Sequence, residues 1–417
     1  MWQGAGLATG LATGLATGLA VALSMAATGT AVAQIAVSAN DAKVKLVDGK
    51  MVVQKDAQPD TVSIIDLRAN PPKVLAEIEV PNSVVGPPLN VAVSPREDIA
   101  LITSNQKIDP ADPSKTIADD KLTVIELQSL KPTLVTRVKS AVGVGKNAMG
   151  TPKVLATLQA GKGAAGVSIN KAGTLALVAN REEGTVSVFS INGTSVTPAG
   201  KVTVGGEKSG PSAVSFDPDG KSALVTRDAD HRITQLTIDG SKVELGKREI
   251  AAGLRPYGLD ISSKGDVAVV ANVGVGGGDA DTISLIDLKL DPPRVVATHT
   301  VGQTPEGIKL SPDGKFVAVT VMNGSNKPAS SPFFNGNGLL QIWSRTGTQL
   351  TKMAELAIGR WCQGIAWSAN GKTLLVQCMV EEEINVIRFS GLAGRSLQKV
   401  GSIKTKGGPA GIRTAEP

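Results

Sequence analysis

Short aliphatic runs, separated by polar turns, recur along most of the chain. Each unit begins with a small residue and an aliphatic run, passes through a turn such as Asp-Pro-Asp-Gly, and continues into a second aliphatic run. Alternation with a period of two indicates strands, and Pro and Gly in the turn favour a tight reversal of the chain. The pattern therefore predicts a repeated β-hairpin. Its copies are residues 90–104, 166–180, 213–227, 258–272, 307–321 and 364–378.

The spacing of these copies predicts the architecture. Most copies follow one another at 45–57 residues, close to the length of a four-stranded propeller blade, about 40–50 residues. The first step is longer and predicts insertions at 106–120 and 143–162. Residues 408–417 begin a further copy, and we expect them to complete one blade with strands from 42–86, because joining the two ends removes exposed sheet edges. The sequence thus predicts an all-β, seven-bladed β-propeller closed by its N- and C-terminal strands.

The first 33 residues differ from the rest of the chain. They contain no Asp, Glu, Lys or Arg and end in Ala31-Val32-Ala33, a pattern that signal peptidase accepts. We therefore expect a signal peptide at 1–33, cleaved after Ala33, and one propeller domain at 34–417 that is periplasmic or secreted. An uncleaved membrane anchor is the alternative, because Gly6, Gly10, Gly14 and Gly18 have the spacing of closely packed membrane helices. No later stretch is long and apolar enough to span a bilayer.

Composition narrows the functional classes. Hydrophobic residues make up 41% of the chain and aromatic residues only 3%, so small aliphatic side chains, which suit stacked sheets, supply the core. The net charge of +6 is mild for this length and includes no basic block typical of nucleic-acid arms. No His/Cys cluster has zinc spacing, and no Gly-x-Ser-x-Gly nucleophile motif is present. We expect no metal and no cofactor.

Several motifs resemble the YVTN β-propeller repeat. These are the run Gly184-Thr185-Val186-Ser187-Val188, the turn-containing segment 210–220, and the triplets Val178-Ala179-Asn180 and Val270-Ala271-Asn272, which stand where the family has Val-Thr-Asn. The resemblance covers about 42–417, although the Tyr typical of the family is absent. It implies a propeller fold. It leaves function open, because the family includes surface-layer proteins, DNA-binding periplasmic propellers and lactonase-like enzymes.

Loops that enter the first strand and follow the second strand of each unit should gather on one face of a propeller. Four arginines in these loops come from different blades, and we expect them to converge on an anionic ligand, since guanidinium groups match paired oxygens. The alternative is that each arginine pairs with a neighbouring acid. The candidate ligand-binding residues are Arg181, Arg227, His231, Arg255, Tyr257, Asn272, Gln303, Asn323, Arg360 and Trp361.

These residues predict an exported, non-catalytic propeller that binds an anionic small molecule or a protein partner at its central face, and that is a monomer. One alternative is a lactonase-like hydrolase, with His231 as general base and Arg227, Arg255 and Glu382 beside it. Another is a docking subunit of a periplasmic redox system. Nucleic acid is a further class of anionic partner, for which the chain offers few aromatic stacking platforms near this face, chiefly Tyr257 and Trp361.

The two cysteines predict a disulfide. Residues that face each other in an antiparallel hairpin have a constant sum of numbers, and the sum for Cys362 and Cys378 centres on residue 370, inside the Ser368–Gly371 turn. The two side chains should therefore lie opposite each other, and an oxidising compartment would preserve the bond. The alternative is a pair of reduced thiols, or a register slip by one residue that places them on opposite faces.

Overall fold

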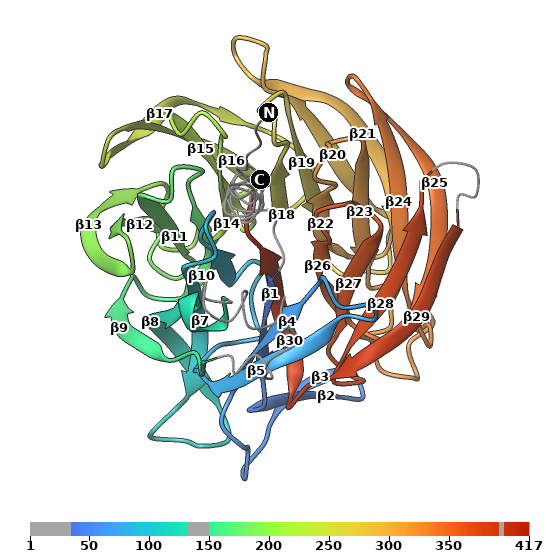
Figure 1. Cartoon of the computed structure of the whole chain (residues 1–417). Coiled ribbons are helices and arrows are strands. Elements are labelled where there is room, and N and C mark those ends of the chain that lie inside the picture. The colour runs from blue at the N-terminus through green and yellow to red at the C-terminus, as the bar shows by residue number, and fades with distance from the viewer. Residues whose placement is uncertain (1–34, 132–149, 392–395, 417) are drawn as a thin grey trace, which may run out of the picture. The chain divides into compact units, whose positions relative to one another are not determined.

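Seven four-stranded antiparallel sheets and one two-stranded sheet make up the part of the chain that the computed structural model describes, residues 35–131, 150–391 and 396–416. The sheets radiate as blades around a common centre (Figure 1). The first strands of neighbouring blades pack against one another in a closed ring. The predicted seven-bladed β-propeller is confirmed.

Each blade runs from an innermost strand at the centre of the ring to an outermost strand at its rim. Blade 1 comprises, in this order, β30 (Gly408–Thr414), β1 (Ile35–Asp41), β4 (Thr61–Asp66) and β5 (Lys73–Glu79). Blade 2 comprises β6 (Val91–Val93), β7 (Ile99–Ile108), β8 (Thr116–Glu126) and β9 (Val154–Gln159). Blade 3 comprises β10 (Ala164–Ile169), β11 (Leu175–Asn180), β12 (Thr185–Asn192) and β13 (Ser195–Thr203). Blade 4 comprises β14 (Pro211–Phe216), β15 (Ser222–Arg227), β16 (Arg232–Asp239) and β17 (Lys242–Ile250).

The other three blades follow the same order. Blade 5 comprises β18 (Pro256–Ile261), β19 (Val267–Asn272), β20 (Asp281–Asp287) and β21 (Arg294–Gly302). Blade 6 comprises β22 (Pro305–Leu310), β23 (Phe316–Val321), β24 (Gly338–Thr346) and β25 (Gln349–Ile358). Blade 7 comprises β26 (Cys362–Trp367), β27 (Thr373–Cys378), β28 (Glu383–Ser390) and β29 (Ser396–Lys404). The separate hairpin of β2 (Val44–Val47) and β3 (Lys50–Val53) lies between β1 and β4 in the sequence. Between the blades, Val, Leu, Ile and Ala from facing sheets form the core.

The ring closes through the chain ends, as predicted. The C-terminal β30 pairs with β1 from Ala36↔Thr414 to Asp41↔Gly408, so one blade contains both ends of the described chain. The sequence pattern placed the partner strands at 42–86, but the direct partner of β30 lies just before that range. All residues of β1 are buried, and a strand covered on both faces lacks the alternation that marks a half-exposed strand.

A buried Asn ends the second strand of three blades and explains two of the repeated motifs. Asn180 Nδ2 donates hydrogen bonds to Thr185 Oγ1 and Ser187 Oγ on the third strand, and Asn40 and Asn272 do the same in their blades. The Oδ1 atoms of Asn180 and Asn272 also accept the N–H of a glycine in the loop that enters the blade. The Val-Ala-Asn and Thr-Val-Ser motifs are thus two halves of one structural contact.

In blade 7 a cysteine takes the position of this Asn. Cys378 ends β27, faces Cys362 at the start of β26, and forms a disulfide with it. The predicted bond and register are confirmed. The Nδ2 of Asn385 contacts the Cys378 sulfur at 2.9 Å.

The prediction of a signal peptide at 1–33, and of the alternative anchor, falls outside the described residues. Within the residues that the structure describes, no helix is long and apolar enough to cross a membrane.

Candidate functional site

Equivalent positions of the seven blades meet at one face of the propeller, around the ring of first strands. One such position lies at the end of the second strand, directly after the place that the buried Asn occupies in blades 1, 3 and 5. It is polar or charged in blades 1–4 and apolar in blades 5–7. Its members, in blade order, are Asp41, Asn105, Arg181, Asp228, Val273, Met322 and Met379.

A buried ion cluster lies where blades 3, 4 and 5 meet. The Asp228 carboxylate is 1% exposed and receives Arg181 Nη1 at Oδ1 and Arg255 Nη2 at Oδ2, both at 2.7 Å. Ser212 Oγ donates to the same carboxylate at 2.5 Å. Burial acts to raise the pKa of Asp228, but Arg181, Ser212 and Arg255 outweigh burial and hold this pKa below its ordinary value. Two guanidinium groups and one carboxylate leave one net positive charge.

Tyr257 and Glu306 extend the cluster into blades 5 and 6. The Arg181 guanidinium carbon lies 5.5 Å from the centroid of the Tyr257 ring, within cation–π range. Glu306 is 8% exposed, and burial raises its pKa to about 8, although Trp361, Gln363, Arg255 and Arg181 partly oppose the rise. A carboxyl group with a pKa near neutrality beside two arginines can take up and release a proton at physiological pH.

Backbone conformation places two of these side chains. Arg255 and Trp361 each stand directly before the first strand of a blade, and both have left-handed backbone angles, φ 56° and 44°. Gly163 and Gly210 hold the same position in blades 3 and 4 with φ 74° and 65°. Glycine adopts this conformation without strain, whereas arginine and tryptophan do not. Thr304 holds the same position before β22 of blade 6 with φ 55°, so the loops that enter blades 5, 6 and 7 all have a non-glycine residue in this conformation.

The structure brings together only some of the predicted arginines. Arg181 and Arg255 converge, as expected. Arg227 instead lies against its own blade, where it donates to Thr234 Oγ1 and pairs with Asp230 and Glu249. The expected convergence of four arginines is wrong for Arg227.

Arg360 also does not belong to the cluster. It pairs with Glu381 at 3.1 Å, with 45% of its side chain exposed. Trp361 lies nearby but turns inward, and its Nε1 donates to Glu306 Oε2 at 3.4 Å.

Three other predicted residues form hydrogen bonds that hold strands and loops in place. Asn272 is the buried structural Asn of blade 5. Gln303 Nε2 donates to the Phe333 carbonyl at 3.4 Å, and Asn323 Nδ2 donates to the Asn337 carbonyl at 3.2 Å. Both contacts hold the long loop after β23.

The two acid–base candidates of the lactonase alternative are engaged elsewhere. His231 Nδ1 accepts the backbone N–H of Arg255 at 3.2 Å. A neutral imidazole in this position carries its proton on Nε2, so its remaining nitrogen is a donor and not a base. Glu382 pairs with Lys45 of β2 at 2.8 Å. His231 thus bonds to the backbone of Arg255, and Glu382 pairs with the β2–β3 hairpin.

Sequence reasoning left Asp228 and Glu306 out of the site. Aligning the first strands of the repeats identifies Glu306. Pro256-Tyr257-Gly258 and Pro305-Glu306-Gly307 occupy the same positions, so an acid stands where the other blades have residues that carry no charge. Asp228 is found by aligning the ends of the second strands, where it matches Arg181. No group of three or more His, Cys, Asp or Glu side chains within the described ranges could hold a metal ion.

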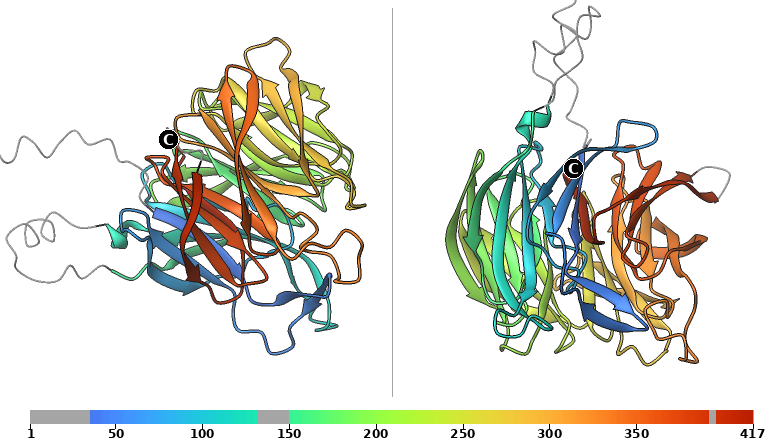
Figure 2. Two further views of the ribbon diagram at one scale, coloured as in Figure 1. Left: turned by 90° about the vertical axis from the view of Figure 1, so that its right-hand side faces the viewer. Right: turned by 90° about the horizontal axis from the view of Figure 1, so that it is seen from below.

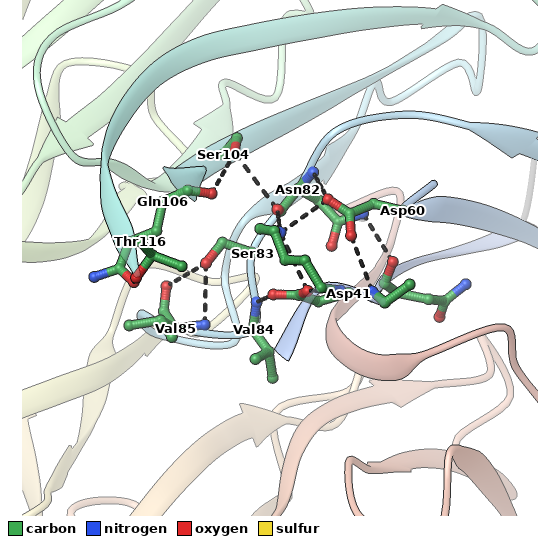
Figure 3. A network of polar contacts seen from close by, with 12 residues as sticks. Asp41, Asp60, Asn82, Ser83, Val84, Val85, Ser104, Gln106 and Thr116 are labelled. Atoms are coloured by element: carbon green, nitrogen blue, oxygen red, sulfur yellow. Dashed lines mark hydrogen bonds and ion pairs between the residues drawn. The ribbon is translucent and has the colours of Figure 1, made fainter. Parts of the chain in front are cut away.

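A second buried polar network lies beside the face, at the end of blade 1 that carries the β2–β3 hairpin (Figure 3). Lys43 Nζ pairs with Asp41 Oδ1 at 3.1 Å and Asp60 Oδ2 at 2.8 Å and donates to the Asn82 carbonyl. Burial raises the pKa of Asp41 to about 6, although Lys43 opposes the rise. The network fixes the base of the β2–β3 hairpin to the loop that leads into blade 2.

The family described as "Lactonase, 7-bladed beta-propeller" matches residues 146–255, which include Arg181, Asp228 and Arg255. No curated protein sequence matches the chain.

Several solved structures share the fold. A candidate 6-phosphogluconolactonase from Bacteroides fragilis is 17% identical, with a TM-score of 0.65, and the match covers 93% of this chain and 99% of that one. The periplasmic gluconolactonase of Pseudomonas aeruginosa is 14% identical, with a TM-score of 0.65 over 93% and 100% of the two chains. Hydrazine synthase of Kuenenia stuttgartiensis is 18% identical, with a TM-score of 0.56 over 81% and 91%. The chain is thus similar to this family over residues 146–255 and shares the fold of these propellers.

Proposed function

We propose that the protein is a hydrolase that opens lactone rings at the cluster of Arg181, Arg255 and Glu306. The observation that carries the proposal is a buried carboxyl group with a pKa of about 8 beside two arginines that share one carboxylate. The match to the lactonase family over the residues that contain both arginines supports it. The fold shared with two propellers named for gluconolactone hydrolysis suggests sugar lactones as the first substrates to test.

The chemistry follows from the charges of the site. Ionised Glu306 accepts a proton from water as the water oxygen attacks the lactone carbonyl carbon. The carbonyl oxygen becomes an oxyanion, and the net positive charge of the arginine pair stabilises it. The ring C–O bond then breaks, and Glu306 returns the proton to the departing ring oxygen, which yields an open-chain hydroxy acid. One carboxyl group with a pKa near the working pH serves both steps.

The remaining residues position these groups. Asp228 receives both guanidinium groups, which holds them in one place and limits their net charge. Tyr257 lies under Arg181, and burial raises the pKa of its phenol, so it stays neutral and can donate to a substrate hydroxyl. This arrangement supports recognition of a polyhydroxylated ring.

Turnover of glucono-1,5-lactone, followed by acid release, tests the proposal. Arg255→Met should lower kcat/KM about 10²–10³-fold, because an oxyanion loses one of its stabilising donors. Arg248→Met is the matched control, since Arg248 is exposed on β17, and it should leave the rate unchanged. Equal rates for the two variants, or no turnover of any lactone by the parent, would contradict the proposal.

Non-catalytic binding of an anion is the second candidate, and the net positive charge of the cluster favours it. A protein that binds a carboxylate without turning over lactones, and loses that binding in Arg255→Met, would support this function over hydrolysis. A docking role toward a redox partner is a separate proposal, supported only by the fold shared with hydrazine synthase.

We also propose that the protein is exported and cleaved after Ala33. The buried Cys362–Cys378 disulfide supports this, because such bonds persist in oxidising compartments. Sequencing the N-terminus of protein recovered from the periplasm should find Gln34 first. Recovery of the intact N-terminus in the membrane fraction would favour the anchor instead.

A further inference from the structure

The β2–β3 hairpin reaches across the face that carries the cluster. Its base is fixed in blade 1 by the Lys43 network (Figure 3). Its tip contacts the loop after β23 of blade 6, where Asp48 Oδ1 accepts the Ala329 N–H at 3.1 Å and Gly49 lies directly against Pro328. Both views of Figure 2 place the dark-blue hairpin and this orange loop on the same face.

Between its base in blade 1 and its tip at blade 6, the hairpin packs over Trp361. Val44, Leu46 and Val53 from its two strands belong to one apolar cluster with Trp361 and Met379 of blade 7. Lys45 adds an ion pair to Glu382 of the same blade, 2.8 Å long. The hairpin therefore spans blades 1, 7 and 6 and packs on the tryptophan between them.

Trp361 connects this cover to the proposed catalytic group. Its backbone N–H donates to Ser325 Oγ at 3.0 Å, and its indole Nε1 donates to Glu306 Oε2 at 3.4 Å. Its left-handed backbone, φ 44°, is unfavourable for a tryptophan, so the surrounding contacts must hold it in place. Glu306, Trp361 and the hairpin are thus three successive layers.

We propose that Trp361 is a positioning residue, which the β2–β3 hairpin holds against Glu306 so that the carboxyl group is oriented and shielded from water. The proposal rests on the proposed function of Glu306. It assigns the hairpin, an insertion in blade 1, a role at a site built from blades 3–6.

The indole of Trp361 and the apolar hairpin shift the pKa of Glu306 in opposite directions. A hydrogen bond from the indole N–H stabilises the carboxylate and lowers the pKa of Glu306. Apolar cover keeps water away and raises that pKa. The other ionisable groups that face Glu306 are Arg181, Arg255 and Tyr257, with Asp228 behind the arginines. The test variants at Trp361 and in the hairpin leave all four of these residues unchanged.

Two variants separate the layers. Trp361→Phe keeps an aromatic ring, smaller than the indole, and removes the N–H. Replacing residues 45–52 by Asn-Gly removes Leu46 and the tip that contacts blade 6 but keeps the Val44–Val53 pair, because Asn-Gly forms a two-residue hairpin turn. The shortened hairpin therefore thins the apolar cover over Trp361. Lys45→Met is the control for the ion pair to Glu382 that the shortened hairpin also loses.

The readout is the midpoint of kcat/KM against pH for glucono-1,5-lactone. Trp361→Phe should move the midpoint upward by about 0.5–1 pH unit and lower the rate at pH 7 about 3–10-fold, with recovery at higher pH. The shortened hairpin should move the midpoint downward, and Lys45→Met should not move it downward. Shifts of the same sign in both variants, or none in either, would overturn the proposal.

A measurement without turnover keeps this test independent of the proposed function. The pH dependence of unfolding free energy between pH 6 and 9, compared with and without Glu306→Gln, reports the ionisation of Glu306 directly. The same opposite shifts should appear there even if the protein opens no lactone. If lactones are turned over but neither profile shifts, the hydrolase stands and the role of Trp361 and the hairpin falls.

Discussion

Glu306→Gln is expected to abolish lactone opening and, above neutral pH, to make the protein more stable than the parent. The carboxyl group of Glu306 is buried, and its pKa is raised from 4.5 to about 8 in the folded protein. Between these two values the folded state keeps a proton that the unfolded state releases. The stability of the parent therefore falls as pH rises, by at most about 1.4 kcal/mol per pH unit.

The variant removes this effect, because a glutamine amide does not titrate. Its stability advantage over the parent should grow by about 2–3 kcal/mol between pH 6 and pH 8, while its kcat/KM falls about 10²–10⁴-fold. Asp41, with a pKa of about 6, titrates across the lower edge of this window, but it is present in both proteins, so its contribution cancels in the difference between them. Denaturant unfolding at several pH values measures the difference.

Glu244→Gln provides the matched control, since Glu244 lies on the outermost strand of blade 4 and is exposed. It should change neither the slope of stability with pH nor the rate. The parent should show the complementary behaviour, with activity rising through pH 8 as stability declines. A variant that is less stable than the parent at every pH, or that retains full activity, would remove Glu306 from the proposed chemistry.

The fold could be predicted because its signals are local and repeated. A single Val-Ala-Asn motif is a weak signal, but three of the blades share a buried Asn that bonds to two hydroxyl groups of the next strand, and the hairpin pattern recurs along the chain. The disulfide could be placed for a similar reason, because the hairpin turn fixes which residues face each other. The fully buried β1 was missed, since burial on both faces hides the alternation of a strand. The expected insertions at 106–120 and 143–162 were also wrong in part, because the first contains the ends of β7 and β8 and the second contains β9, the outermost strand of blade 2.

The site could be predicted only in part, because one residue along a strand reverses the direction of a side chain. Arg227 occupies the position of Asn180, whereas Arg181 occupies the next one. Arg227 therefore bonds within its own blade and Arg181 reaches the neighbouring blade. Likewise Trp361, and not Arg360, is the equivalent of Arg255. Treating the four arginines as one set of loop residues ignored this register.

Truncation before Gly408 is expected to cost the protein its cooperative fold. Residues 408–416 supply the innermost strand of blade 1, and Ala410, Ile412 and Ala415 are at most 4% exposed. Their loss would leave the inner edge of β1 unpaired and open the ring between β26 and β6. It would also remove Glu416, which pairs with the buried Lys309 of blade 6 at 2.6 Å. The far-UV and near-UV circular dichroism of the truncated protein should show lost tertiary packing or a melting temperature lower by more than about 10 °C.

Two further measurements separate closure from a general effect of truncation. Ile412→Ala in the full chain should destabilise by about 2–4 kcal/mol, because it leaves a cavity in a well-packed core, whereas Val400→Ala, exposed on β29, should change stability by less than about 0.5 kcal/mol. A synthetic peptide of residues 408–417 added to the truncated protein should restore the melting transition in a concentration-dependent way, since it can pair with β1 as a separate strand. The edge it fills exists only if the chain ends close the ring. An unchanged melting curve after truncation, or a peptide that restores nothing to a destabilised protein, would show that closure through β30 does not hold the propeller together.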